Sequence, residues 1–186
     1  EMAETPAEAT IASRLKLPDG YKIGVYASFL PNARVMVMTS AGDIAVSLPR
    51  VGEIALVKAD GDGDGRSDGT TTLLSGLNKP HGITLNGNYL YVAENQQISR
   101  YPFDGLIGAV TGGQEVIFTG LPEGGNHWSR TISFGPDGKL YVTVGSSCNV
   151  CLETENYRAS MLVMNADGSN ARTYATGLRN SAGFDW

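Results

Sequence analysis

The residues of this chain best suited to bind a metal ion are four aspartates in one short stretch. Asp60, Asp62, Asp64 and Asp68 occupy positions 1, 3, 5 and 9 of an EF-hand-like loop, with glycine at position 6. Calcium prefers carboxylate oxygens of this kind. Position 12 is Thr71 in place of the bidentate glutamate, and strand-like sequences flank the stretch, so it is no true EF-hand. A peripheral calcium site and a solvated turn between outer strands both remain open.

The two cysteines form a second group with possible chemistry. Cys148 and Cys151 are separated by two residues. A tetrahedral zinc site would need a second pair of Cys or His ligands, which the chain does not offer. A thioredoxin-like motif should open a helix, whereas this pair follows the strand-like residues 139–144. A small structural disulfide, which would imply an oxidising compartment, and two free thiols are the interpretations that remain.

A third group of residues could transfer a proton and stabilise negative charge. His81 and His127 are the only histidines, and a neutral imidazole can remove a hydroxyl proton near physiological pH. Arg179 and Asn180 combine a guanidinium charge with a neighbouring amide donor, which together can stabilise negative charge that develops on an oxygen. A lone residue of these types more often satisfies hydrogen bonds in its own turn. These four residues can act as one site only if the fold brings them together.

An internal repeat indicates which elements could do so. Glycine, at 24 residues, separates short runs rich in Val, Ile, Thr and Tyr, and we find no amphipathic helix. Similar segments begin at Leu30, Leu77, Leu121 and Leu178, a spacing that suits propeller blades of about 40–50 residues. Four strand candidates recur in each unit: 34–38, 43–47, 53–58 and 71–74; 82–85, 89–93, 98–101 and 115–119; 131–134, 139–144, 160–164 and 172–175. The sequence therefore predicts an all-β fold, a β-propeller with four-stranded blades.

The repeat also predicts how much of a propeller is present. Three units are followed by the start of a fourth innermost strand at Ala182, which stops at Trp186. Closed propellers have about four to eight blades, so this number cannot close a ring. We expect residues 1–20 to be an N-terminal tail leading into the first blade, and residues 21–186 to be a partial propeller truncated at the fourth blade. The missing blades would come from the rest of the polypeptide or from a second chain.

The candidate residues recur at one position of the repeat. His81, His127 and Asn180 lie just before or at the innermost strands of consecutive units. Innermost strands surround the central channel of a propeller. We therefore expect these side chains to line one mouth of that channel.

Residues 124–141 contain Asn126-His127-Trp128-Ser129-Arg130-Thr131 and then Phe134-Gly135-Pro136-Asp137-Gly138-Lys139-Leu140-Tyr141. This stretch resembles the signature of sorbosone dehydrogenase-type quinoproteins, which are relatives of soluble glucose dehydrogenase. Residues 145–151 resemble that family's loop after the same strand, and residues 77–82 and 177–180 resemble its blade-opening turns. The resemblance covers about residues 15–186 and corresponds to the N-terminal half of such a dehydrogenase.

The resemblance implies a six-bladed propeller that binds pyrroloquinoline quinone (PQQ) and calcium over its central channel and oxidises an aldose or a related carbonyl hydrate. His127 matches the family's general base. Arg179 and Asn180 match side chains beside the reactive quinone carbonyl, where they would stabilise the reduced quinone. His81 corresponds to a polar side chain near the cofactor, and Asn126 stands beside the histidine where soluble glucose dehydrogenase carries an acid. The ligands of the quinone-bound calcium are expected outside this stretch of sequence.

Composition narrows the partners and the location. The formal charge of −5, the pI near 5.0 and the scattered Lys and Arg residues argue against a nucleic-acid partner. No apolar run approaches the roughly 20 residues needed to span a bilayer. Residues 1–12 look like a mature N-terminus after removal of a signal peptide, so we predict a periplasmic or secreted protein. The resemblance implies a sugar substrate and an electron acceptor such as a cytochrome or a quinone.

Two other classes of function also fit a propeller. A calcium-dependent lactonase or related hydrolase would need converging Glu, Asn and Asp ligands, whereas the blade-opening turns here offer mostly His, Asn and Arg. A non-catalytic propeller could bind carbohydrate or protein. Only the quinoprotein should reduce a dye in the presence of quinone and sugar.

Overall fold

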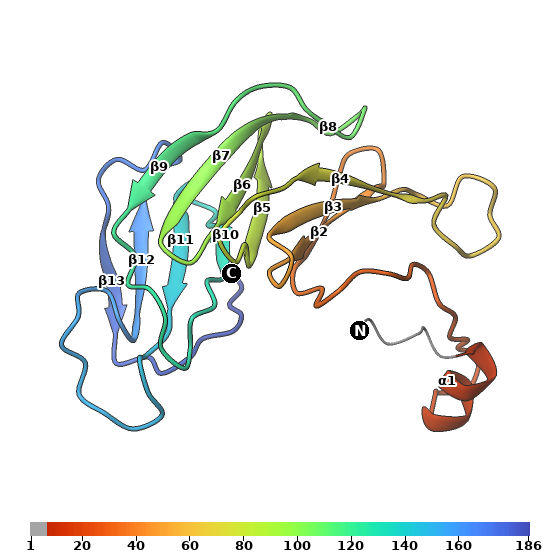
Figure 1. The fold of residues 1–186 in the computed structure, drawn as a ribbon, viewed down its shortest axis with the longest axis horizontal. Coiled ribbons are helices and arrows are strands. Elements are labelled where there is room, and N and C mark those ends of the chain that lie inside the picture. Colours follow the sequence, from red (N-terminus) through yellow and green to blue (C-terminus); the bar gives the residue numbers. More distant parts are fainter. Residues whose placement is uncertain (1–6) are drawn as a thin grey trace.

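The computed structural model describes residues 7–186, which form an arc of three antiparallel sheets (Figure 1). Blade 1 contains β1 (Met36–Met38), β2 (Ile44–Leu48), β3 (Glu53–Val57) and β4 (Thr70–Leu74) in that order. Blade 2 contains β5 (Gly82–Asn86), β6 (Tyr89–Ala93), β7 (Gln97–Asp104) and β9 (Glu115–Thr119), with β8 (Ala109–Val110) also pairing with β7. Blade 3 contains β10 (Ile132–Phe134), β11 (Leu140–Val144), β12 (Ser160–Met164) and β13 (Arg172–Thr176). The predicted all-β fold with four-stranded blades is confirmed.

Three local features differ from the expectation. Residues 8–14 form a short helix, α1 (Glu8–Arg14), within the expected N-terminal tail. β7 continues to Asp104 and pairs with β8, because the turn that follows folds the chain back onto the strand. Residues 182–186 are not a strand in this structure, and the prediction of an innermost strand there was wrong for the described chain. A strand requires a hydrogen-bonded neighbour, and none of the strands among residues 7–186 pairs with this segment.

The hydrophobic core lies between the blades, where side chains from facing sheets interdigitate. One buried cluster joins Leu56 of blade 1 to Leu90 and Phe103 of blade 2. A second joins Tyr91 of blade 2 to Leu140 of blade 3. Full burial of one such side chain contributes about 1.5–3 kcal/mol. Consecutive blades are therefore held as one unit, and the positions of their inner strands are fixed relative to each other.

Hydroxyl groups join the inner ends of neighbouring blades. The Oγ of Ser47 accepts a hydrogen bond from the backbone N–H of Val35 (3.1 Å) and donates to the carbonyl of His81 in the next blade (2.7 Å). Thr143 of blade 3 repeats this pattern with the N–H of Thr131 (3.2 Å) and the carbonyl of Ser181 (2.9 Å). The chain before β5 and the chain after β13 are thus each tied to the preceding blade.

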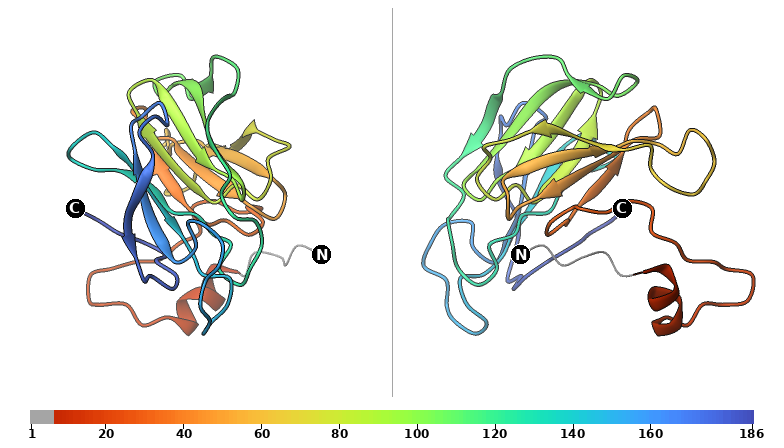
Figure 2. Two further views of the ribbon diagram at one scale, coloured as in Figure 1. Left: turned by 90° about the vertical axis from the view of Figure 1, so that its left-hand side faces the viewer. Right: turned by 45° about the vertical axis from the view of Figure 1, so that its right-hand side comes forward.

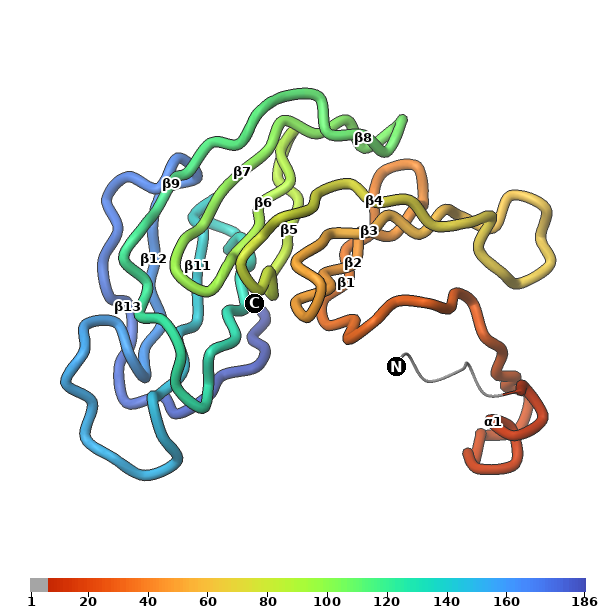
Figure 3. The backbone as a smooth tube through the Cα atoms, viewed as in Figure 1, coloured from red at the N-terminus to blue at the C-terminus, as the bar shows by residue number. Residues whose placement is uncertain are grey.

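Several loops extend beyond the sheets. The loop between β3 and β4 projects at one end of the arc, and the loop between β11 and β12 hangs from the other end (Figures 1 and 3). Helix α1 lies away from the three blades in all views (Figure 2), and Arg66 of the β3–β4 loop pairs with its Glu8. Among residues 7–186 no helix has the length and apolar character that crossing a membrane requires.

Candidate functional site

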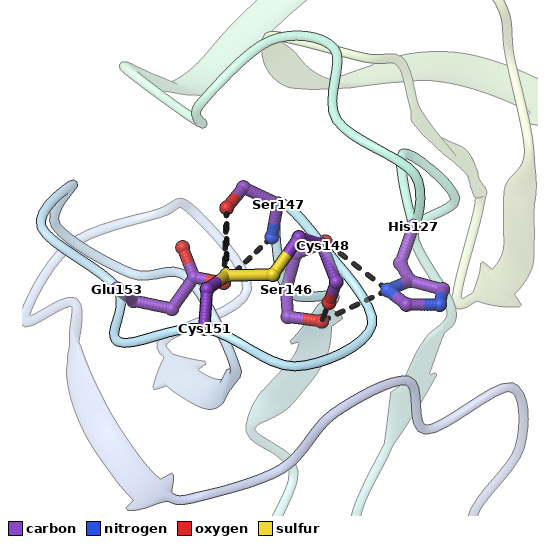
Figure 4. The surroundings of a disulfide bond; sticks show 6 residues. All are labelled: His127, Ser146, Ser147, Cys148, Cys151 and Glu153. Carbon is purple, nitrogen blue, oxygen red and sulfur yellow. Dashed lines mark hydrogen bonds between the residues drawn. A yellow bond between two sulfur atoms is a disulfide. The ribbon is translucent and has the colours of Figure 1, made fainter.

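His127 lies in the loop that leads into β10, and its ring faces the chain that leaves β11 (Figure 4). Its Nδ1 is 2.8 Å from the Oγ of Ser146 and 3.2 Å from the Ser146 carbonyl oxygen. Gly145 makes this approach possible, because a Cβ there would come within 2.4 Å of the His127 Cβ. The glycine is therefore needed for the position of the imidazole.

The contacts of His127 indicate which nitrogen carries the proton. A carbonyl oxygen can only accept, so the contact with the Ser146 carbonyl requires a proton on Nδ1. The Ser146 hydroxyl donates its own hydrogen to the carbonyl of Cys148 (2.6 Å) and can accept from His127. Nε2 makes no hydrogen bond within the described part of the chain. It is therefore the basic nitrogen of the ring.

The loop after Ser146 contains the cysteine pair. Cys148 and Cys151 form a close pair, with their Sγ atoms 2.09 Å apart (Figure 4). Glu153 closes the same loop, because its Oε1 accepts a hydrogen bond from the backbone N–H of Ser147 at 2.7 Å (Figure 4). The Cys148 carbonyl that receives the Ser146 hydrogen is thus held by a small closed loop.

Two arginines hold the loop that carries His127. Arg130 is fully buried, and Arg158 is also buried. Between them they donate to six carbonyls, those of Asn95, Pro122, Glu123, Gly124, Trp128 and Ser129. Arg158 is paired with Glu155 (2.8 Å), whereas no carboxylate pairs with Arg130 among the described residues. Burial, with a smaller contribution from the nearby Arg158 charge, lowers the pKa of Arg130 to about 10.

His81 lies directly before β5, the innermost strand of blade 2. Ala93 stands where the neighbouring blades carry the bridging hydroxyl, and His81 replaces that bridge with a contact from Nδ1 to the carbonyl of Arg130 (3.0 Å). The ring also meets Trp128 edge-on, with 5.8 Å between the centroids. Burial lowers the pKa of His81, and the charges of Arg34 and Arg130 lower it further, while the hydrogen bond to the Arg130 carbonyl opposes the change. His81 therefore joins two blades at the predicted mouth of the channel.

Arg179 and Asn180 lie beside the same group. The Arg179 carbonyl accepts a hydrogen bond from the backbone N–H of Ser146 at 2.7 Å, and both side chains are exposed. Asn126 is also exposed and is tied through its backbone N–H to the carbonyl of Ser147 (2.8 Å). The structure thus brings His81, His127 and the Arg179–Asn180 turn to one edge of the blades. Ser146 contacts the His127 ring, whereas no hydrogen bond joins Asn126 to this ring among residues 7–186.

The acidic loop lies elsewhere, between β3 and β4 at the far end of the arc (Figure 3). Carboxylate oxygens of Asp60, Asp62 and Asp68 lie within 4.8 Å of one another, and Asp64 is not in this group. Asp60 accepts hydrogen bonds from the backbone N–H groups of Gly63, Asp64 and Gly65. These bonds lower the pKa of Asp60, with the largest contribution from Gly65. Calcium binding by the four aspartates stays a prediction.

Sequence reasoning missed four residues that shape this site. Ser146 and Arg130 fall inside the segments that resemble the quinoproteins, but a serine and an arginine in such segments carry no signal of their contacts. Arg158 lies in a long loop, and its partners are 34 and 35 residues away in sequence. Arg34 lowers the pKa of His81 through its charge, and its proximity to His81 is likewise apparent only in the folded structure.

Comparison with known families identifies the relatives of this chain. A family model described as TrAA12-like matches residues 15–186. The chain belongs to the TrAA12-like family. No curated protein matches its sequence significantly.

Solved structures agree with this family at the level of the fold. The PQQ domain of pyranose dehydrogenase from Coprinopsis cinerea, in its holo form, superposes with a TM-score of 0.76 at 17% identity, over 89% of this chain and 43% of that one. The calcium structure of a family AA12 carbohydrate-active enzyme from Trichoderma reesei gives 0.69 at 19% identity, over 88% and 41%. The PQQ-bound aldose sugar dehydrogenase from Streptomyces coelicolor gives 0.64 at 23% identity, over 85% and 54%. The chain spans about half the length of these proteins. A similarity to PQQ-dependent sugar dehydrogenase propellers is therefore confirmed, whereas the sorbosone dehydrogenase type stays a prediction.

Proposed function

We propose that this chain forms part of a PQQ-dependent sugar dehydrogenase of the sorbosone or aldose dehydrogenase type, in which His127 is the general base. The observation that carries the proposal is the orientation of the His127 ring. Its Nδ1 is held by Ser146, and Nε2 remains for substrate. A base must hold an unprotonated nitrogen toward the hydroxyl that it deprotonates.

The charges at this edge of the blades suit the proposed cofactor. PQQ is an anion with three carboxylates, and the turns beside His81 and His127 carry the exposed cations Arg34, Lys79 and Arg179. Lys79 is oriented by the ring of Trp128, whose centroid lies 5.6 Å from its Nζ. Cations of this type bind carboxylates through charge-assisted hydrogen bonds. The residues present therefore fit the group.

The proposed mechanism assigns one task to each residue. When bound, PQQ supplies the acceptor for a hydride from the sugar carbon. His127 Nε2 removes the proton of the sugar hydroxyl, which favours departure of the hydride. Arg179 and Asn180 would hold the quinone, and their positive charge and amide donor would stabilise negative charge on its carbonyl oxygen. His81 and Asn126 would contact the cofactor from the same edge.

We test the proposal with His127→Asn, which removes the base but keeps a polar side chain of similar size. The complete propeller that contains this chain is incubated with PQQ and calcium, and sugar-dependent reduction of a dye is measured. Loss of the general base should lower kcat about 100-fold or more, while PQQ binding, followed by absorbance, stays near wild type. His81→Asn is the matched control and should lower kcat by less than about tenfold. Full activity of His127→Asn, or no dye reduction by wild type with any aldose, would refute the proposal.

We propose two calcium sites, one beside the quinone and one in the acidic loop at residues 60–68. For the loop, the readout is a calcium titration followed by the amide resonances of residues 60–68. The double variant Asp62→Asn, Asp68→Asn should abolish any saturable shift, and the wild-type loop should show one. A linear, unsaturated response of the wild type would identify the loop as a solvated turn.

A non-catalytic propeller is the alternative with structural support. A chain of a nidogen–laminin complex superposes with a TM-score of 0.56 at 16% identity, so the fold by itself does not specify a redox enzyme. Carbohydrate or protein binding without dye reduction would favour this class, whereas hydrolysis of a lactone would favour the calcium-dependent hydrolases. The proposed electron acceptor is a cytochrome or a quinone, and we propose a periplasmic or secreted location, with which the close cysteine pair is compatible.

A further inference from the structure

We infer that Ser146 is a positioning residue that keeps the imidazole proton of His127 on Nδ1, and so presents Nε2 as the base. The functional part of this inference rests on the proposed role of His127. The structural part stands on two hydrogen bonds of one hydroxyl group. The Ser146 Oγ lies 2.8 Å from His127 Nδ1 and 2.6 Å from the Cys148 carbonyl oxygen.

A hydroxyl group has a single hydrogen, which decides the direction of both bonds. The Cys148 carbonyl can only accept, so the Ser146 hydrogen points toward it. The lone pairs of the Ser146 Oγ then face His127, and Nδ1 must supply the proton for that contact. The Ser146 carbonyl, 3.2 Å from the same nitrogen, also requires a donor. Both acceptors of Ser146 therefore select the same tautomer of His127.

The surroundings hold Ser146 in this arrangement. Its side chain is buried, and its backbone N–H donates to the Arg179 carbonyl at 2.7 Å. Gly145 precedes it and leaves room for His127. The carbonyl of Cys148 belongs to the loop closed by the cysteine pair and by Glu153. Ser146 thus connects the proposed base, the proposed charge-stabilising turn and the closed loop.

The direct test is the tautomer of His127, measured by long-range ¹H–¹⁵N correlation spectra of the imidazole rings at a pH where both are neutral. The chain has only two histidines, so the spectrum is simple to assign. We expect wild-type His127 to carry its proton on Nδ1. Ser146→Ala should shift part of the population toward Nε2–H, because it removes the shorter contact (2.8 Å) and leaves only the longer one to the backbone carbonyl (3.2 Å). His81 serves as an internal reference, because its Nδ1 bonds to the Arg130 carbonyl, which the substitution at position 146 leaves in place.

Matched variants separate positioning from a general effect on the loop. Ser147→Ala removes the neighbouring hydroxyl, which bonds to Glu153 and not to His127, and should leave the tautomer unchanged. Ser146→Thr keeps the hydroxyl and should preserve the Nδ1–H form. In the dye assay, Ser146→Ala should lower kcat on the order of tenfold, the size expected for one lost hydrogen bond at the base, with KM nearly unchanged.

The outcomes are distinguishable from those of the proposed function. A wild-type His127 with its proton on Nε2 overturns the inference, even if Ser146→Ala does not fold. An unchanged tautomer in folded Ser146→Ala also overturns it, as does a tautomer change without any effect on kcat in an active enzyme. A Ser146-dependent Nδ1–H form in a protein without quinone-dependent activity supports the positioning and refutes the redox function.

Discussion

Replacing Arg130 with methionine should destabilise the protein and loosen the loop that carries His127. Arg130 is fully buried and donates hydrogen bonds to the carbonyls of Asn95, Pro122, Trp128 and Ser129. Methionine has a similar length but no donors. The four carbonyls would lose their charged partner, and the loop would lose one of its two arginine anchors.

The expected magnitude follows from two opposing terms. Four hydrogen bonds from a charged donor, at about 1.5 kcal/mol each, contribute roughly 6 kcal/mol. Burial lowers the pKa of Arg130 to about 10, and since one pKa unit corresponds to about 1.4 kcal/mol, removing the buried charge returns roughly 3 kcal/mol. The difference predicts a net loss of roughly 3 kcal/mol in the free energy of unfolding, within the range for broken buried polar networks.

Urea denaturation followed by tryptophan fluorescence measures this loss, since Trp128 lies in the same loop. Arg50→Met is the matched control, because Arg50 is exposed in a turn, and it should change the stability by less than about 0.5 kcal/mol. Hydrogen exchange should become faster for the amides of residues 122–129 in Arg130→Met. A variant as stable as wild type, with unchanged exchange in this loop, would refute the argument that Arg130 anchors it.

Three further predictions concern packing, pH and the cysteine pair. Gly145→Ala should cost about 1–3 kcal/mol by overpacking, because its Cβ would lie 2.4 Å from that of His127; Gly113→Ala, which has open space, should be nearly neutral by the same urea assay. The pKa of His81 is lowered in the folded state from its ordinary 6.5, so the unfolded chain binds more protons than the folded one just below pH 6.5. The free energy of unfolding should therefore fall on acidification through this range, and His81→Gln should flatten the dependence of Tm on pH. Reducing the cysteine pair should cost about 2 kcal/mol by the loop-closure model, measured by denaturation with and without a thiol reductant.

Much of the fold could be read from local patterns. The strands predicted at 160–164 and 172–175 coincide closely with β12 (Ser160–Met164) and β13 (Arg172–Thr176), because alternation and turn residues determine such elements within a few neighbours. The short helix α1 was missed, since none of its residues is buried and it has no apolar face to detect. The segment 182–186 was expected as a strand from its place in the repeat, but pairing depends on a neighbour and not on the segment itself.

The candidate site, like the fold, could be predicted from the sequence only in part. The types and spacing of His81, His127 and Asn180 were enough to predict that they gather at one edge of the blades, because each lies near the start of a repeat unit. The sequence could not predict that Ser146 orients His127, or that His81 replaces a bridging hydroxyl between blades 2 and 3. The first contact joins residues 19 positions apart and depends on the pairing of β10 with β11 within blade 3. The second joins residues 49 positions apart, and only the packing of blade 2 on blade 3 brings them within hydrogen-bonding distance.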